Sequence, residues 1–157
     1  ADAVTYALSE EGVLCMLRGG DRIERWVDTR VTRGGALALG GEHVAVAAGD
    51  GVVRLFRVGT LAYSGTLPRP VRVGGHDEPE PLDEVCESSS PPGVSFPDAI
   101  ACAFDTDGTA LTVAYSDRSV VVWDTKNVAN VRRLRVFFAH SGSVFGEFLS
   151  FTFVWSI

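Results

Sequence analysis

The feature that most constrains the fold is a pair of similar stretches that lie far apart in the chain. They read VAVAAGDGVVRLFR at 44–57 and LTVAYSDRSVVVWD at 111–124. Asp50 and Asp117 take the same place in the two stretches, as do Phe56 and Trp123. Valine-rich runs on either side of a short turn favour β-strands. The chain therefore contains an internal repeat of strand, turn and strand.

More strand-like runs surround the two stretches, with a turn signal between neighbours. Four strands per unit and a Trp-Asp ending are typical of a WD40-type β-propeller blade, which repeats every ~40–45 residues. Asp50 and Asp117 are 67 positions apart (117 − 50), which is too far for one blade. The excess lies at 69–97, where Pro, Ser and acidic residues gather. That composition predicts a surface insertion, because it cannot form a packed strand.

The predicted fold is all-β, with about three WD40-type blades in an incomplete ring, since closed propellers have roughly 4–8 blades. The predicted division is a partial blade at 1–33, a blade at 34–68, the acidic Pro/Ser-rich insertion at 69–97, a blade at 98–138, and the start of a further blade with an aromatic-rich tail at 139–157. Open strand edges and apolar faces favour association. We therefore expect that remaining blades or self-association must cover them.

The aspartates of the repeat are predicted to be structural. Asp suits a tight turn because its carboxylate accepts hydrogen bonds from nearby backbone N–H groups. In many such blades the Asp also holds a His that links, through Ser or Thr, to the Trp indole, and a fully satisfied network fixes the blade. No His lies at 93–98, where this partner is expected. We assign blade-turn roles to Asp50, Asp117, Trp123, Asp124 and His140.

A catalytic interpretation of these residues is weaker. Asp117 and Asp124 flank one strand and would point to its opposite ends, whereas catalytic carboxylates need a partner across a cleft. A triad of Ser116, His140 and Asp117 lacks the GxSxG elbow that would support it. The GGDR and GDG segments are expected to be hairpin turns, because no helix follows either one to bind a phosphate. The sequence therefore predicts no catalytic residue and no enzyme.

Composition narrows the class of partner. The net charge of −6 argues against nucleic acid, because phosphate binding needs a concentrated cationic surface. The basic cluster RRLR at 132–135 is interpreted as a solvated strand face. No cofactor or metal is expected, since His76, Cys86 and Cys102 lack the short paired spacings of zinc sites. No signal peptide or membrane-spanning run is evident, and three unpaired cysteines suit a reducing, cytoplasmic compartment.

Several longer segments carry a family resemblance. GVLCML at 12–17, RIERWVDTR at 22–30, AGDGVVRLFRVGTLAYSGTLPRP at 48–70 and the run from FPDAIACAFD to HSGSVF at 96–145 together resemble the mitogen-activated protein kinase-binding protein family. The resemblance implies a partial N-terminal propeller from a large WD40 scaffold. Known members bind stress-activated kinases through regions beyond the propellers, and they associate with centrosomes or spindle poles. After Phe145 the chain departs from the family and ends in GEFLSFTFVWSI.

The resulting functional hypothesis is a non-enzymatic scaffold segment that binds other proteins. Asp77, Glu78, Glu80, Asp83 and Glu84 form an acidic cluster that would attract a basic partner, although a merely solvated loop explains the same composition. Two alternatives stay open. One is a truncated gene product without autonomous function, which the unusual tail suggests. The other is a hydrolase built on a propeller, which would need convergent His, acidic or metal-ligating side chains.

Overall fold

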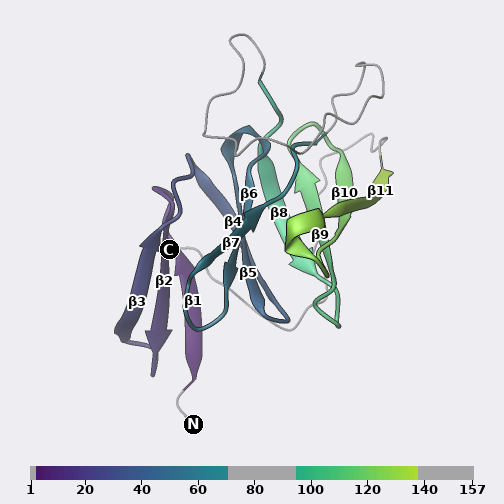
Figure 1. The fold of residues 1–157 in the computed structure, drawn as a ribbon. Coiled ribbons are helices and arrows are strands. Elements are labelled where there is room, and N and C mark those ends of the chain that lie inside the picture. The colour runs from purple at the N-terminus through teal and green to yellow at the C-terminus, as the bar shows by residue number, and fades with distance from the viewer. Residues whose placement is uncertain (1–2, 71–94, 138–157) are drawn as a thin grey trace.

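The computed structural model describes residues 3–70 and 95–137. These residues form three antiparallel sheets that follow one another across the molecule (Figure 1). We call them the first, second and third blades. The first contains β1 (Val4–Leu8), β2 (Val13–Arg18) and β3 (Arg22–Asp28). The second contains β4 (Gly34–Gly40), β5 (His43–Ala48), β6 (Val53–Arg57) and β7 (Tyr63–Thr66). The third contains β8 (Ala99–Phe104), β9 (Ala110–Tyr115), β10 (Val120–Asp124) and β11 (Arg132–Phe137).

This arrangement confirms the all-β prediction of blades in an open ring. Two short 3₁₀ turns, η1 (Gly49–Gly51) and η2 (Val128–Asn130), are the helical elements of the described part of the chain. The finer division into domains stays a prediction. Much of the insertion and the whole segment from 139 onward lie outside the described residues.

The turns show which strands of the three blades correspond. The β1–β2, β5–β6 and β9–β10 turns are each closed by a backbone hydrogen bond of 2.9 Å, donated by Ser9, Ala48 and Tyr115 to the carbonyl four residues on. Hence β1 corresponds to β5 and β9. The strand order β4-β5-β6-β7 and its counterpart β8-β9-β10-β11 place β4 and β8 at one edge of each sheet. Among the described residues, the first blade has no strand in that position.

A β-bulge also recurs in all three blades. The register between the third and fourth strand positions shifts after Met16 in the first blade, after Leu55 in the second and after Val122 in the third. A bulge adds one residue to one strand and increases the local right-handed twist. The outermost strand of every blade therefore twists more strongly at the same place.

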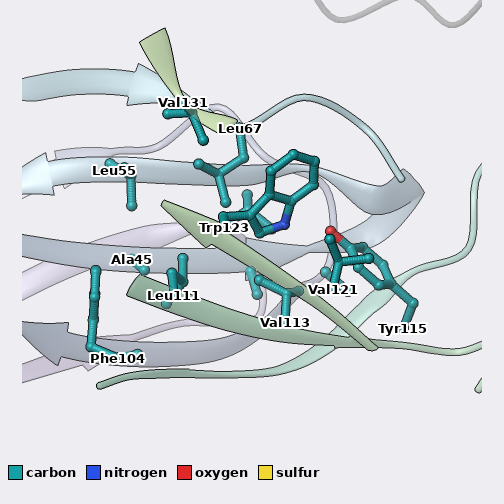
Figure 2. Packing of buried hydrophobic residues seen from close by; sticks show 14 residues of the cluster. Ala45, Leu55, Leu67, Phe104, Leu111, Val113, Tyr115, Val121, Trp123 and Val131 are labelled. Carbon is teal, nitrogen blue, oxygen red and sulfur yellow. The ribbon is translucent and has the colours of Figure 1, made fainter. Parts of the chain in front are cut away.

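Two clusters of buried side chains hold the blades together. One lies between the first and second blades and includes Leu14, Val44 and Phe56. The other lies between the second and third blades, where Leu55 meets Leu111 and Trp123 (Figure 2). Burying a side chain of this size contributes roughly 1.5–3 kcal/mol to stability. Each core is built from two sheets, so neither sheet buries its apolar face alone.

The inner strands β4 and β8 approach closely at glycine positions. A Cβ atom on Gly40 would overlap the Cβ and ring atoms of Phe104, and one on Gly35 would lie 2.9 Å from the carbonyl oxygen of Ala99. Glycine at these places lets one backbone approach the neighbouring blade. The second and third blades are thus joined by backbone proximity as well as by side-chain burial.

We predict that Gly40→Ala destabilises the chain by about 1–3 kcal/mol, because overpacking forces side chains or backbone to shift. Urea unfolding followed by circular dichroism measures the effect. In the background Phe104→Ala the cost should be smaller, since two of the three atoms that obstruct the new methyl group, the ring carbons Cγ and Cδ2, are gone. An equal cost in both backgrounds would contradict the proposed contact.

Candidate functional site

The strongest polar cluster of the described residues surrounds Asp50, in the turn between β5 and β6. Asp50 has φ of 56° and ψ of 32°, in the left-handed region. Asp and Asn tolerate that conformation better than most non-glycine residues. Gly51 follows with φ of 68°, and a Cβ there would lie 2.9 Å from Pro70 Cδ. The turn therefore brings the Asp50 carboxylate against the start of the insertion.

The carboxylate of Asp50 bonds to both ends of that insertion. Its Oδ2 atom accepts a hydrogen bond of 3.0 Å from Nη2 of Arg69, which also makes the pair an ion pair. Its Oδ1 atom accepts a hydrogen bond of 3.0 Å from the backbone N–H of Phe96. The Arg69 guanidinium lies 4.9 Å from the centroid of the Phe96 ring. Arg69 and Phe96, which are 27 positions apart in the chain (96 − 69), thus meet at one side chain.

Asp98 extends the cluster to the third blade. Its Oδ1 atom accepts hydrogen bonds from the backbone N–H of Asp50, at 2.8 Å, and from Nη2 of Arg33, at 3.0 Å. Its backbone N–H donates to Oγ of Ser116, at 3.0 Å, and its carbonyl accepts from the Ser116 N–H, at 2.9 Å. The turns of Asp50 and of Asp117 are therefore bridged by one residue that precedes β8.

We call Asp50, Arg69, Phe96 and Asp98 the neck cluster, because they close the base of the segment 71–94. All four are at least partly exposed, so each ion pair contributes modestly, about 0–1 kcal/mol. Their joint effect is geometric. The described residues that border 71–94 on its two sides lie together, beside the turn between β5 and β6.

Asp117 lies in the equivalent turn of the third blade, and its side-chain hydrogen bonds to described residues are local. Its Oδ1 atom accepts from the N–H and the hydroxyl of Ser119, at 2.9 and 2.6 Å. Asp124 ends β10, and its Oδ1 atom accepts from the N–H of Lys126 at 3.1 Å. The two aspartates stand on either side of one strand, and each supports a backbone turn.

Trp123 is buried against the second blade, and its indole N–H has no hydrogen-bond partner of standard geometry among the described residues. The same holds for the buried hydroxyl of Tyr115. Figure 2 shows these two polar atoms pointing toward each other. Burial raises the pKa of Tyr115 above its usual value, while the proximity of the Trp123 indole acts in the opposite direction. Tyr115 therefore occupies the space beside the indole, where Ser or Thr was expected.

Two cysteines lie among the described residues, and both are free thiols. Cys102 is partly exposed as a residue, yet protein surrounds its sulfur, and this burial raises the pKa of the thiol to about 12. A thiol with that pKa is neutral at physiological pH and a poor nucleophile. Cys102 therefore packs as a neutral side chain beside Ala47.

Several predicted residues lie outside the described part of the chain. They are His140 and the acidic cluster Asp77, Glu78, Glu80, Asp83 and Glu84. Within residues 3–70 and 95–137, no group of three His, Cys, Asp or Glu side chains could hold a metal ion. The described residues also contain no helix that could span a membrane.

The sequence repeat pointed to Asp50 but did not predict the residues that bond to it. Arg33, Arg69, Phe96 and Asp98 lie in segments that the sequence shows only as loop. One signal was available, because Asp98 directly precedes a strand and a β-propeller brings that position close to the turn of the preceding blade. The pairing of Arg69 with Asp50 carries no such signal, since no spacing rule applies across an insertion.

We predict that Asp50→Ala lowers stability by about 1–3 kcal/mol, because it removes an acceptor from the partly buried Phe96 N–H and strains a left-handed residue. Asp50→Asn should cost less, since an amide keeps an acceptor and tolerates the conformation. Thermal unfolding measures stability, and the rate of proteolysis within 71–94 measures how firmly the neck cluster holds the two ends of that segment. Equal values for the two variants would contradict this account.

We also predict that Tyr115→Phe changes stability by less than about 1 kcal/mol at pH 8, because the hydroxyl is buried without a good partner. Leu111→Ala, in the same core, should cost about 2–5 kcal/mol. Because folding raises the pKa of Tyr115, the unfolding free energy of the parent chain does not depend on this group below pH ~10, the pKa of an unfolded tyrosine. Above that pH the unfolded chain ionises first, and the unfolding free energy falls. Urea unfolding should therefore show that the unfolding free energy falls less between pH 8 and pH 10.5 for Tyr115→Phe than for the parent chain.

Comparison with known proteins identifies relatives of the whole described region. Pig WD repeat-containing protein 62 is 26% identical over 153 residues, which is 98% of this chain and 9% of the relative. Mouse mitogen-activated protein kinase-binding protein 1 is 30% identical over 144 residues, which is 89% of this chain and 9% of the relative. The chain thus spans about a tenth of these relatives. No family model matches it.

The fold has a counterpart among solved structures. The structure of U3-55K matches with a TM-score of 0.62 and 13% identity, over 88% of this chain and 36% of the other. This likeness concerns the fold alone. The sequence matches, at 26–30% identity, support the predicted resemblance to the mitogen-activated protein kinase-binding protein family of WD-repeat proteins.

Proposed function

We propose that this chain is a non-enzymatic segment of a protein–protein interaction scaffold. One observation carries the proposal: the carboxylates at the predicted turns are engaged by the chain itself. Asp50 is held by Arg69 and Phe96, and Asp117 is held by Ser119. Such carboxylates organise loops, and they are not disposed as a pair facing a common substrate. The relationship to WD-repeat proteins supports the same function.

The acidic insertion is the proposed contact surface. Residues 71–94 contain six acidic residues and one arginine, a net charge of −5 (1 − 6), against −6 for the whole chain with His neutral. Most of the net charge therefore resides in one segment. The neck cluster supports its use in binding, because it fixes the place at which both ends of the segment leave the blades. A basic partner would be attracted to this charge.

The cellular context is also part of the proposal. The mouse and human relatives are named for binding a mitogen-activated protein kinase. We place this chain in a cytoplasmic assembly linked to such signalling, with enrichment at the centrosome or spindle pole. Imaging of the tagged parent protein through the cell cycle tests this placement, and uniform distribution at all stages would contradict it.

We predict that neutralising the acidic cluster strongly reduces capture of partners that bind through the insertion. The variant carries Asp77→Asn, Glu78→Gln, Glu80→Gln, Asp83→Asn and Glu84→Gln in the full-length protein. Quantitative proximity labelling compares its partners with those of the parent protein. At least one basic partner should fall about tenfold, because surface charge mainly controls association rates and specificity.

Deletion of residues 72–94, with a short Gly-Ser closure, is the second test. It should lose the same partners as the neutralised variant while retaining the thermal unfolding midpoint. An unchanged partner set in both variants would show that the insertion is a solvated loop. Esterase or phosphatase activity of the purified chain, abolished by Asp50→Asn or Asp117→Asn, would overturn the non-enzymatic assignment.

A further inference from the structure

The outer edge of the third blade has an unusual combination of exposed groups. β11 is the last strand of its sheet, and among the described residues no other strand pairs with its free edge. Five of its six residues are exposed. An unpaired edge offers a row of backbone N–H and C=O groups to another chain. The side chains along the free edge of β11 determine which chain could pair with it.

The charges of β11 have one sign. Arg132, Arg133 and Arg135 are exposed and form no ion pair with any described residue. Arg132 lies opposite Asp124 in the register, so Arg133 and Arg135 carry the uncompensated charge. The strand itself contains no acidic residue.

The other two outermost strands differ. β3 mixes its arginines with Glu24 and Asp28, and Glu24 pairs with Arg18 at 2.7 Å. β7 carries no charge, and η2 lies against it, with Val128 beside Gly65. Arginines without any acidic residue in the same strand are therefore specific to β11 among the outermost strands of the described blades.

Apolar groups accompany this charge. Leu134 is 54% exposed and Phe137 is 45% exposed. Arg135 pairs with Val122 and Phe137 pairs with Val120, so Arg135 and Phe137 lie on the same face of the sheet. Arg133 pairs with Trp123 and lies on the opposite face, because the β-bulge adds Leu134 between the two arginines. The charges, together with the bulge at Leu134, would explain an edge protected against unwanted pairing. Two large exposed apolar side chains serve no such protection. β3 also exposes Ile23 and Trp26, so β11 is distinguished by the combination of apolar groups with arginines that have no acidic neighbour in the strand.

We propose that the outer edge of β11 binds an extended acidic peptide of a partner protein by strand addition. Backbone hydrogen bonds would extend the sheet, as in other complexes of this kind. Neighbouring residues of a strand point to opposite faces. Two consecutive acidic residues would therefore reach Arg133 on one face and Arg135 on the other, while an apolar residue covers Phe137. This surface is separate from the insertion and adds a second contact to the proposed scaffold.

A peptide fits better than nucleic acid. Nucleic-acid binding draws on a concentrated cationic surface, whereas this chain is acidic overall and β11 offers three arginines beside apolar groups. Backbone pairing also requires a partner with peptide N–H and C=O groups. The observations therefore favour a peptide, and an oligonucleotide becomes a control.

The test is a titration of the full 157-residue chain with a labelled synthetic peptide that alternates Val and Thr around a central Asp-Glu pair. Fluorescence anisotropy gives Kd. Arg133→Gln with Arg135→Gln should weaken binding at least tenfold. The matched control is Arg22→Gln with Arg25→Gln, on the outermost strand of the first blade, and it should change Kd less than twofold. A peptide with Asn-Gln at its centre should bind at least tenfold more weakly.

The outcomes separate the explanations. Equal weakening by both double variants would indicate general electrostatic attraction and overturn the proposal, as would equal affinity for the neutral peptide. Tighter binding of a ten-nucleotide single strand, lost in the β11 variant, would reassign the edge to nucleic acid. Circular dichroism must show an unfolding midpoint like that of the parent for each variant. The neutralised insertion should leave this Kd unchanged, so failure here leaves the insertion proposal standing.

Discussion

The structure depends on burial between neighbouring sheets. Each blade has two faces, and an apolar face is stable only when a second sheet removes it from water. Phe56 meets the first blade, whereas Leu55, its neighbour in the same strand, meets the third. Successive residues of a strand point to opposite faces, so one strand serves two cores. The repeat in the sequence is the signature of this requirement, because each blade must offer the same two faces.

Much of the blade architecture could be predicted because it follows from local patterns. The valine-rich runs around Asp50 and Asp117 lie in strands, and the tight turns between them are where the spacing placed them. Tryptophan at position 123 is buried, as the end of a blade repeat implies. Alternation and turn chemistry are properties of short segments, so a single sequence carries them.

Contacts between distant segments could not be predicted from local sequence patterns. The hydrogen bonds of Asp50 to Arg69 and Phe96 cross an insertion, and no periodicity links those positions. The bulges after Met16, Leu55 and Val122 depend on strand pairing rather than on the residues alone. The blade-turn network was expected to contain Ser or Thr beside the indole, and the large side chain of Tyr115 stands there. In each case tertiary packing decides between local choices that the sequence leaves equivalent.

The neck cluster also bears on how much this region of the chain can vary. The entropy lost in closing a flexible loop grows only with the logarithm of its length, so a doubling costs about 0.6 kcal/mol. Here the ends are held by Asp50 through contacts that do not involve the residues between them. Lengthening or replacing those residues would leave both blade cores intact. Selection could then change the contact surface that we propose for this segment without changing the residues that form the blades.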